Sequence, residues 1–255
     1  MAEVLSDRQA IEVFHLLFLR AITSGPQKAH LVVKGGCNLR FFFGSVRYSQ
    51  DLDLDVSIVA KETLRKNVDK VLAAPLLLRP LAAYGLEIQA ASSPKQTDTT
   101  QRWKLALRTE GRSLPLQTKI EFSRRGEAEE FRLESVDTAL AHRYRMTPPL
   151  ANHYLLPAAI RQKIRALAGR TEVQARDVFD LALLFARARG KIESRAADKK
   201  MYGKAAERAL AIPYDDYTAQ VVAYLSPEEA EPHASREAWT AQQLQVVDTL
   251  ERLAR

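Results

Sequence analysis

The sequence predicts an α/β domain followed by a second domain built only from helices. Short segments typical of strands occur in the first half of the chain, at 31–33, 51–59, 86–91, 102–108 and 116–123. After Pro148-Pro149 such segments disappear, and apolar residues recur at the three- and four-residue spacing of helices. We therefore expect the two domains to span residues 1–148 and 149–255.

The composition is typical of a globular protein with a basic surface. The chain has 255 residues, of which 46% are hydrophobic, so it can bury a substantial core. Its formal net charge of +7 favours polyanionic partners. The segment from Ala141 to Arg176 concentrates this charge, because it holds seven lysines and arginines against the single acid Glu172.

Cysteine usage and hydropathy indicate the cellular compartment. The single cysteine, Cys37, cannot form an internal disulfide and fits a reducing cytoplasm. No apolar run approaches the roughly 18 residues of a membrane span, and the N-terminus lacks a signal-peptide pattern. We therefore expect a soluble cytoplasmic protein with no membrane contact.

The chain is predicted to begin with a helix and then a strand that ends in two glycines. Ser6 and Gln9 have the spacing of a capping box, and Gly25-Pro26 ends the helix that they open. A strand over Leu31–Val33 then leads to Gly35-Gly36 and a short helix.

Three aspartates alternate with apolar residues in the strand that begins at Asp51. Successive side chains of a strand point to opposite faces, so Asp51, Asp53 and Asp55 lie side by side on one face. Carboxylates in a row repel one another, and core formation does not require them. A divalent cation, Mg²⁺ or Mn²⁺, between the first two would remove the repulsion, because hard cations prefer carboxylate oxygens. A solvated sheet face is the alternative explanation.

The turn before this strand has the composition of a phosphate-binding loop. Gly44-Ser45 ends the short helix, and the backbone N–H groups of such a turn can approach a phosphate closely. Ser45 adds a hydroxyl group, and Arg47 and Lys34 add positive charge. Carboxylates that suit a metal, a phosphate-binding turn and nearby cations together indicate phosphoryl chemistry.

Residues 61–84 are predicted to be helical with an interruption near two prolines, and strands follow them. The strand over 116–123 places Lys119 and Glu121 on the face opposite to its apolar side chains. Three cations share one face of the preceding strand: Arg102, Lys104 and Arg108. That face either lies along a nucleic-acid backbone or is merely solvated, and the sequence does not decide between them.

The second half of the chain is predicted to be helical. Helices are expected from Pro157 and over about 173–189, 196–212, 214–225 and 235–253. Asp177 and Asp180 fall in the first turns of the second of these helices, where aspartates commonly interact with the helix dipole. By spacing alone, these two aspartates are ordinary.

One set of residues in the first half follows a known motif in order. The chain reads Lys34-Gly35-Gly36, then Gly44-Ser45, Arg47 and Ser49-Gln50-Asp51-Leu52-Asp53. This order resembles the first motif of the AbiEii-like (abortive-infection, type IV toxin–antitoxin) nucleotidyltransferase toxins. The wider nucleotidyltransferase superfamily shares only the Gly-Ser and Asp-x-Asp parts, so the remaining parts point to the toxin branch.

A later motif of the same family is also matched. It pairs a Lys-hydrophobic-x-Ala-Leu helix with Arg-Asp-x-x-Asp-Leu, as in Lys163–Leu167 and Arg176–Leu181 here. The resemblance implies that Lys163 neutralises triphosphate charge and that Asp177 acts as base on the attacking hydroxyl. Asp180 is the second choice for that role, or orients Arg176 or Lys163. The resemblance covers roughly residues 31–184 and departs from the usual pattern at Cys37-Asn38.

The resemblance implies a polymerase-β-like nucleotidyltransferase fold with a mixed sheet, and an active site in the cleft between the two domains. Asp51 and Asp53 would hold the metal, with Glu121 from a neighbouring strand as the third ligand. The residues implied to contact the nucleotide are Gly44, Ser45, Arg47, Ser49, Lys34 and Lys163.

The implied reaction is metal-dependent transfer of a nucleoside monophosphate from a nucleoside triphosphate, with release of pyrophosphate. Some family members modify the 3′ end of transfer RNA, and the basic segment favours such an RNA acceptor, whose modification would block translation and growth. Its candidate contacts are Arg143, Arg145, Arg161, Arg165 and Arg170. The implied partner is a cognate antitoxin. Two alternatives remain: transfer to a protein hydroxyl or small molecule, and a non-catalytic RNA-binding or regulatory protein.

Overall fold

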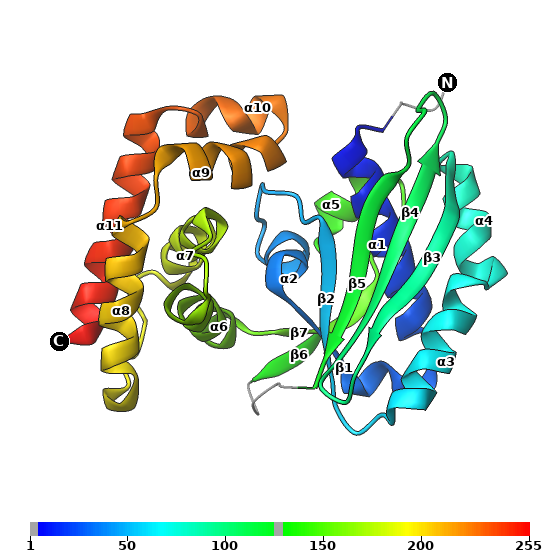
Figure 1. The fold of residues 1–255 in the computed structure, drawn as a ribbon, viewed down its shortest axis with the longest axis horizontal. Coiled ribbons are helices and arrows are strands. Elements are labelled where there is room, and N and C mark those ends of the chain that lie inside the picture. Colours follow the sequence, from blue (N-terminus) through cyan, green and yellow to red (C-terminus); the bar gives the residue numbers. More distant parts are fainter. Residues whose placement is uncertain (1–4, 125–129) are drawn as a thin grey trace. The chain divides into compact units, whose positions relative to one another are not determined.

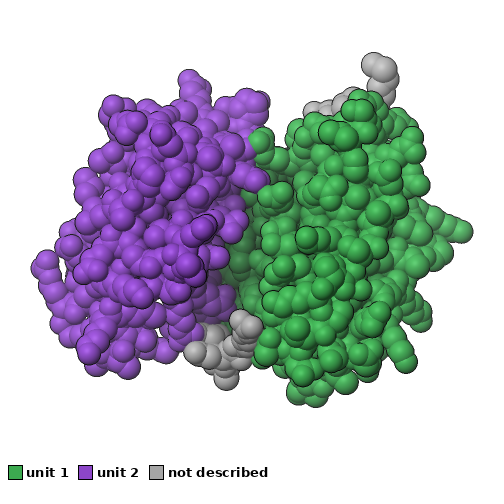
Figure 2. Space-filling view, in the orientation of Figure 1, with its two compact units in different colours: residues 1–44, 48–154 green, residues 45–47, 155–255 purple. Residues whose placement is uncertain are grey.

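The computed structural model describes residues 5–124 and 130–255, which form two compact units (Figure 2). Unit 1 contains the chain up to Gly44 and from Tyr48 to Tyr154. Unit 2 contains Ser45–Arg47 and Leu155–Arg255. The three residues after Gly44 therefore belong to the helical unit by their contacts, although the chain on both sides of them belongs to the sheet unit.

Unit 1 is built on a seven-stranded mixed sheet in the order β3-β4-β5-β2-β1-β7-β6 (Figure 1). Its strands are β1 (Leu31–Lys34), β2 (Asp51–Val56), β3 (Leu86–Gln96), β4 (Thr100–Thr109), β5 (Leu116–Ser123), β6 (Phe131–Ser135) and β7 (Leu150–Tyr154). β2 runs parallel to β5 and β1 parallel to β7, whereas the other neighbouring pairs are antiparallel. The predicted α/β architecture with a mixed sheet is therefore confirmed.

Five α-helices and one 3₁₀ helix accompany this sheet among the described residues. They are α1 (Asp7–Thr23), η1 (Pro26–His30), α2 (Gly35–Phe42), α3 (Lys61–Leu72), α4 (Pro75–Ala83) and α5 (Thr138–Arg143). The predicted capping box is present, because the Ser6 side chain accepts from the Gln9 N–H and the Gln9 side chain accepts from the Ser6 N–H. Pro75 begins α4, where its missing N–H leaves no helical hydrogen bond unmade.

One face of the sheet packs on helices and forms the core of unit 1. Leu52 and Leu54 of β2 and Trp103 of β4 are fully buried there with apolar residues of α1. The Trp103 indole Nε1 donates to Oδ1 of Asp69 on α3 at 2.8 Å, which identifies this face as the helix-covered one. The alternating charged residues of β2, β4 and β5 therefore point to the opposite face, as the sequence predicted.

Strands β6 and β7 were not expected from the sequence. β7 lies beyond Pro148-Pro149, where the sequence predicted only helices, so the sheet unit extends to Tyr154. It has five residues, and it pairs with β1 in parallel and with β6 in antiparallel orientation. Because β1 is more than a hundred residues away in the chain, the local sequence carries little signal for this pairing.

In the described part of unit 2, all regular structure is helical. Its helices are α6 (Leu156–Gly169), α7 (Ala175–Ala188), η2 (Ala196–Asp198), α8 (Lys199–Leu210), α9 (Tyr214–Gln220), η3 (Val222–Tyr224), α10 (Pro227–Ala230), η4 (Glu231–His233) and α11 (Arg236–Ala254). Its core includes Tyr217 and Trp239, whose rings stack with centroids 4.3 Å apart. Within the described residues, no helix is both long and apolar enough to cross a membrane.

A buried ion pair connects α1 and α2 of unit 1. Arg40 Nε donates to Glu12 Oε1 at 2.6 Å, and the Tyr144 hydroxyl donates to Glu12 Oε2 at 2.6 Å. Burial and the Glu12 carboxylate raise the pKa of Tyr144, so its hydroxyl remains a donor. The Arg40 guanidinium also lies 4.3 Å from the ring centroid of Tyr48, three residues before Asp51. The network therefore fixes the chain that leads into β2.

We expect Glu12→Gln to destabilise unit 1 by about 3 kcal/mol, because the substitution leaves the buried Arg40 charge uncompensated. Urea unfolding followed by Trp103 fluorescence in a Trp239→Phe background isolates unit 1, because each unit contains one of the two tryptophans. Glu62→Gln, at an exposed position of α3, is the matched control and should change little. Equal effects of the two substitutions would contradict the prediction.

Candidate active site

Charged residues from three strands meet on the face of the sheet opposite to the core. In the register of the sheet, Asp51 of β2 lies opposite Lys119 of β5, and Asp53 lies opposite Glu121. Lys34 of β1 lies opposite Asp53 on the other side. The structure thus brings Glu121 next to Asp53 from a neighbouring strand, as the sequence analysis expected.

Two of the three carboxylates are paired with cations. Lys119 Nζ lies 2.9 Å from Asp51 Oδ2, and Arg102 Nε donates to Glu121 Oε2 at 2.6 Å. Burial raises the pKa of Asp53, and the neighbouring charge of Asp51 raises it further. Negative charge at Asp53 is therefore unfavourable in the folded unit, and a bound cation would relieve it.

Asp55 has a structural role and is not part of the group formed by Asp51, Asp53 and Glu121. Its carboxylate is buried, accepts from Lys34 Nζ at 2.6 Å, and accepts from the Tyr154 hydroxyl at 2.8 Å. Lys34, a candidate phosphate ligand, is thus engaged by a carboxylate in this structure. Gly35 adopts a φ of +64°, and a Cβ there would lie 3.0 Å from Asp53 Oδ2, so both its backbone conformation and its neighbour require glycine.

The backbone at the start of β2 is held by side chains from three elements. Ser49 Oγ donates to the Asp51 carbonyl oxygen at 2.9 Å, and Cys37 Sγ donates to the same oxygen at 3.2 Å. Thr118 Oγ1 donates to the Gln50 carbonyl oxygen at 2.7 Å. Ser49, a candidate nucleotide ligand, therefore has a structural bond that sets where Asp51 lies.

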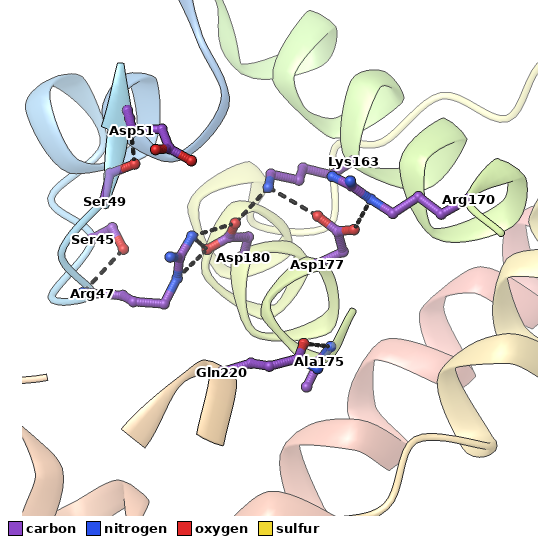
Figure 3. Close-up of polar contacts among 10 residues, drawn as sticks. All are labelled: Ser45, Arg47, Ser49, Asp51, Lys163, Arg170, Ala175, Asp177, Asp180 and Gln220. Atoms are coloured by element: carbon purple, nitrogen blue, oxygen red, sulfur yellow. Dashed lines mark hydrogen bonds and ion pairs between the residues drawn. The ribbon is translucent and has the colours of Figure 1, made fainter. Parts of the chain in front are cut away.

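A second charged cluster lies in unit 2, between α6 and α7. Lys163 Nζ is 3.0 Å from Asp177 Oδ1 and 2.6 Å from Asp180 Oδ2 (Figure 3). Both aspartates are completely buried, with exposed fractions of 0%. Because they occupy positions three residues apart on α7, they present their carboxylates on one side of the helix, where Lys163 lies between them.

Two arginines complete this cluster. Arg47 donates to Asp180 through Nη2, 3.1 Å from Oδ1 and 3.0 Å from Oδ2, and Arg170 Nε donates to Asp177 Oδ2 at 2.8 Å. Burial alone would raise the pKa of Asp180, but Arg47 and Lys163 outweigh it and hold that pKa below its ordinary value. The cluster is thus an alternating row of cation, anion, cation, anion and cation (Figure 3).

The second motif is thus brought together as a charge-paired cluster. Asp180 orients Lys163, which was one of the two expectations for it, but its arginine partner is Arg47 rather than Arg176. Sequence reasoning missed the contacts of Arg47 and Arg170 with these aspartates. Arg47 and Asp180 are 133 residues apart, so no local pattern could have indicated the pair.

The candidate RNA contacts come from both units. Arg143 and Arg145 belong to unit 1 at α5, whose neighbour Tyr144 bonds to Glu12 of α1. Arg161 and Arg165 lie on α6 in unit 2, and Arg170 follows that helix and bonds to Asp177. The basic segment of the sequence is therefore divided between the two units.

The pair of carboxylates on β2 fits a divalent cation. Asp51 and Asp53 offer oxygen ligands on one face, and the pKa of Asp53 is raised in part by its neighbour. Magnesium in phosphoryl-transfer enzymes typically takes one or two protein carboxylates and completes its shell with water and substrate phosphates. Across the described residues, no three His, Cys, Asp or Glu side chains are arranged as a metal site. Arg102 engages only Oε2 of Glu121, so Oε1 is the oxygen with which Glu121 could become a third ligand.

Known proteins resemble this chain in sequence family and in fold. The model of the family described as nucleotidyl transferase AbiEii toxin, type IV toxin–antitoxin system, matches residues 17–253. JHP933 from Helicobacter pylori is 16% identical with a TM-score of 0.64, over 99% of this chain and 95% of its own. MenT4, a nucleotidyltransferase toxin from Mycobacterium tuberculosis, is 20% identical with a TM-score of 0.65, over 97% and 87% of the two chains. No curated protein matches the sequence.

We expect Asp53→Asn to stabilise unit 1 in the absence of divalent cations. The pKa of Asp53 is raised in the folded unit, so its ionised form opposes folding above the ordinary value of 3.8, and a neutral amide removes that penalty. Urea unfolding at neutral pH, followed by Trp103 fluorescence, should show a higher midpoint. The gain should shrink as the pH falls towards 3.8. The control is Asp98→Asn, because the Asp98 side chain is 90% exposed. An equal rise of the midpoint in that variant would contradict the explanation by the charge of Asp53.

We expect Asp180→Asn to destabilise unit 2 by about 3 kcal/mol at neutral pH, because Arg47 loses its buried partner. The folded-state pKa of Asp180 is lowered, so its contribution is fully present above 3.8 and is lost as the pH falls through the lower value. Unfolding followed by Trp239 fluorescence, with Trp103→Phe in the background, measures this difference. Asp216→Asn, at an exposed position of α9, is the control and should not reproduce it.

Proposed function

This chain belongs to the family of AbiEii nucleotidyl transferase toxins of type IV toxin–antitoxin systems, and we propose that it transfers a nucleoside monophosphate to an RNA. The family match covers residues 17–253, so it includes both units. The protein is therefore a nucleotidyltransferase. The proposal concerns its acceptor, its metal and the roles of its residues.

The observation that carries the proposal is the pair of adjacent carboxylates on β2. Asp51 and Asp53 would hold Mg²⁺ or Mn²⁺, which supplies Lewis-acid polarisation of the phosphate that is attacked. Glu121 would join them through Oε1, the oxygen that Arg102 does not engage. The oxygen of the acceptor hydroxyl attacks the α-phosphorus of the nucleoside triphosphate and gives up its proton to solvent. The bond from that phosphorus to the oxygen that bridges to the β-phosphate breaks, and pyrophosphate leaves.

The triphosphate is assigned to the turn before β2 and to the cluster in unit 2. Gly44, with a φ of +65°, and Ser45 offer backbone N–H groups, and Arg47 stands four residues before Asp51 in the chain. The cluster joins three cations to two buried aspartates. An anionic ligand is assigned to Lys163 there. Lys34 and Ser49 are assigned to the same nucleotide.

Asp177 and Asp180 are assigned to positioning rather than to proton transfer. Both carboxylates are completely buried, and each is bonded to two cations. A carboxylate whose pKa is held low, as in Asp180, is a weak base for a hydroxyl. Their bonds fix the directions of Lys163 and Arg47, which is what recognition of a triphosphate requires.

The acceptor is proposed to be the 3′ end of a transfer RNA in the cytoplasm. A net charge of +7 favours a polyanion, and Arg143, Arg145, Arg161 and Arg165 are the proposed phosphate contacts. Modification of that end would stop aminoacylation and hence translation, which fits a toxin. A cognate antitoxin is the partner that a type IV toxin–antitoxin family implies.

We expect label from one α-labelled nucleoside triphosphate to appear on RNA when the protein is incubated with magnesium and total cellular RNA. Asp51→Ala should lower the rate by more than about 100-fold, because it removes a direct metal ligand. Separation of protein and RNA on a gel shows which of them carries the label. Asp98→Asn is the control and should have normal activity. Label on protein would replace RNA as acceptor, and no label with any nucleotide would overturn the proposal.

A further inference from the structure

We propose that a row of four cations on the open face of the sheet binds the phosphate backbone of the acceptor RNA. The cation row consists of Lys95 on β3, Arg102 and Lys104 on β4, and Lys119 on β5. This inference rests on the proposed function, since it names the surface by which that acceptor is held.

The sheet register places these cations directly opposite one another. Lys104 pairs with Lys119 across β4 and β5, and Lys95 pairs with Arg102 across β3 and β4. Opposed side chains on neighbouring strands have Cβ atoms about 5 Å apart, and like charges at such positions destabilise a sheet. Two such pairs on one face serve no folding purpose, because the core residues of β4, such as Trp103, point to the other face.

The row adjoins the proposed metal ligands and carries uncompensated charge. Lys119 is paired with Asp51 and Arg102 with Glu121, so two members contact the carboxylate patch directly. No ion pair of Lys95 or Lys104 occurs within the described residues, and Lys104 is exposed. The row therefore begins beside the proposed metal ligands, and its two unpaired members lie on the strands farther away, β4 and β3. An anionic ligand placed along it would remove both cation–cation repulsions.

The length of the row favours a nucleic-acid backbone over a triphosphate. β5, β4 and β3 follow β2 in order, so the row extends about 14 Å from Asp51 at the usual spacing of roughly 4.8 Å between strands. A chain of phosphodiesters can follow that path, whereas the triphosphate is already assigned to the Gly44-Ser45 turn and Lys163. Lysines contact phosphates as point charges without reading bases, so the binding should not depend on sequence.

The test compares two lysine pairs with the same change of charge. Lys95→Gln/Lys104→Gln removes the two unpaired members of the row. Lys66→Gln/Lys70→Gln removes two exposed lysines from α3, which covers the opposite face of the sheet. Fluorescence anisotropy with labelled transfer RNA and with single-stranded oligonucleotides of different sequence, without nucleotide, measures the dissociation constants over a range of salt.

The row variant should bind every RNA several-fold more weakly than the wild type. The slope of its log affinity against log salt should fall by about 0.7 for each lysine removed, because each phosphate contact releases counterions. The α3 variant should bind like the wild type. Circular dichroism and Trp103 fluorescence verify the fold. Within the described residues, neither lysine pair forms an ion pair that the fold would lose.

Wild-type affinity in the row variant would overturn the inference, even if the transfer assay labels RNA. An unchanged RNA affinity with a raised KM for the nucleoside triphosphate would make the row a triphosphate site and would also overturn it. Equal losses of RNA affinity in both variants would show that only the total charge of the protein matters. That outcome would also overturn the inference. If wild-type protein labels no RNA, the proposed function itself fails, and the transfer assay shows this independently of the binding data.

Discussion

Carboxylates that share one face of a strand repel one another, and at the start of β2 this repulsion shapes the surrounding structure. Asp51 and Asp53 are next to each other on the face away from the core, and Glu121 joins them from β5. Lys119 and Arg102 neutralise two of the three, and the pKa of Asp53 remains raised. The described residues therefore leave an unfavourable negative charge at Asp53, which the proposed divalent cation would relieve.

In unit 2, two buried aspartates fix the side chains of Lys163 and Arg47, the cations that we propose to bind the triphosphate. Burying ions costs free energy, and the pairs offset that cost only because every carboxylate oxygen has a donor. The positions of Asp177 and Asp180 near the start of a helix do not by themselves indicate a function. In the structure, these aspartates support the proposed triphosphate ligands.

Three small residues near the carboxylates have structural roles that motif matching alone does not reveal: Gly35, Cys37 and Ser49. Gly35 leaves room for Asp53 Oδ2, while Cys37 and Ser49 bind the Asp51 carbonyl oxygen. The buried pair of Glu12 and Arg40 holds the segment behind them. These contacts explain how a short motif can fix the directions of its acidic side chains.

The sequence by itself determined the classes of structure and chemistry. Period-two alternation gave the strand at 116–123 its bounds, which the structure reproduces in β5, and helical spacing predicted the second half. The capping box at Ser6 and the aspartates alternating from Asp51 are local patterns, so the sequence is sufficient to predict them. The two motifs were also sufficient to indicate the family, which the match over residues 17–253 confirms.

Only the tertiary structure decided which charges meet. The pairing of Arg47 with Asp180, of Arg102 with Glu121, and of β7 with β1 joins residues that are far apart in the chain. Strand register likewise decided that Lys104 faces Lys119, which turned an ambiguous basic strand into a row beside the carboxylates. Periodicity reports which face a side chain occupies, but its neighbour on that face depends on how distant segments pack.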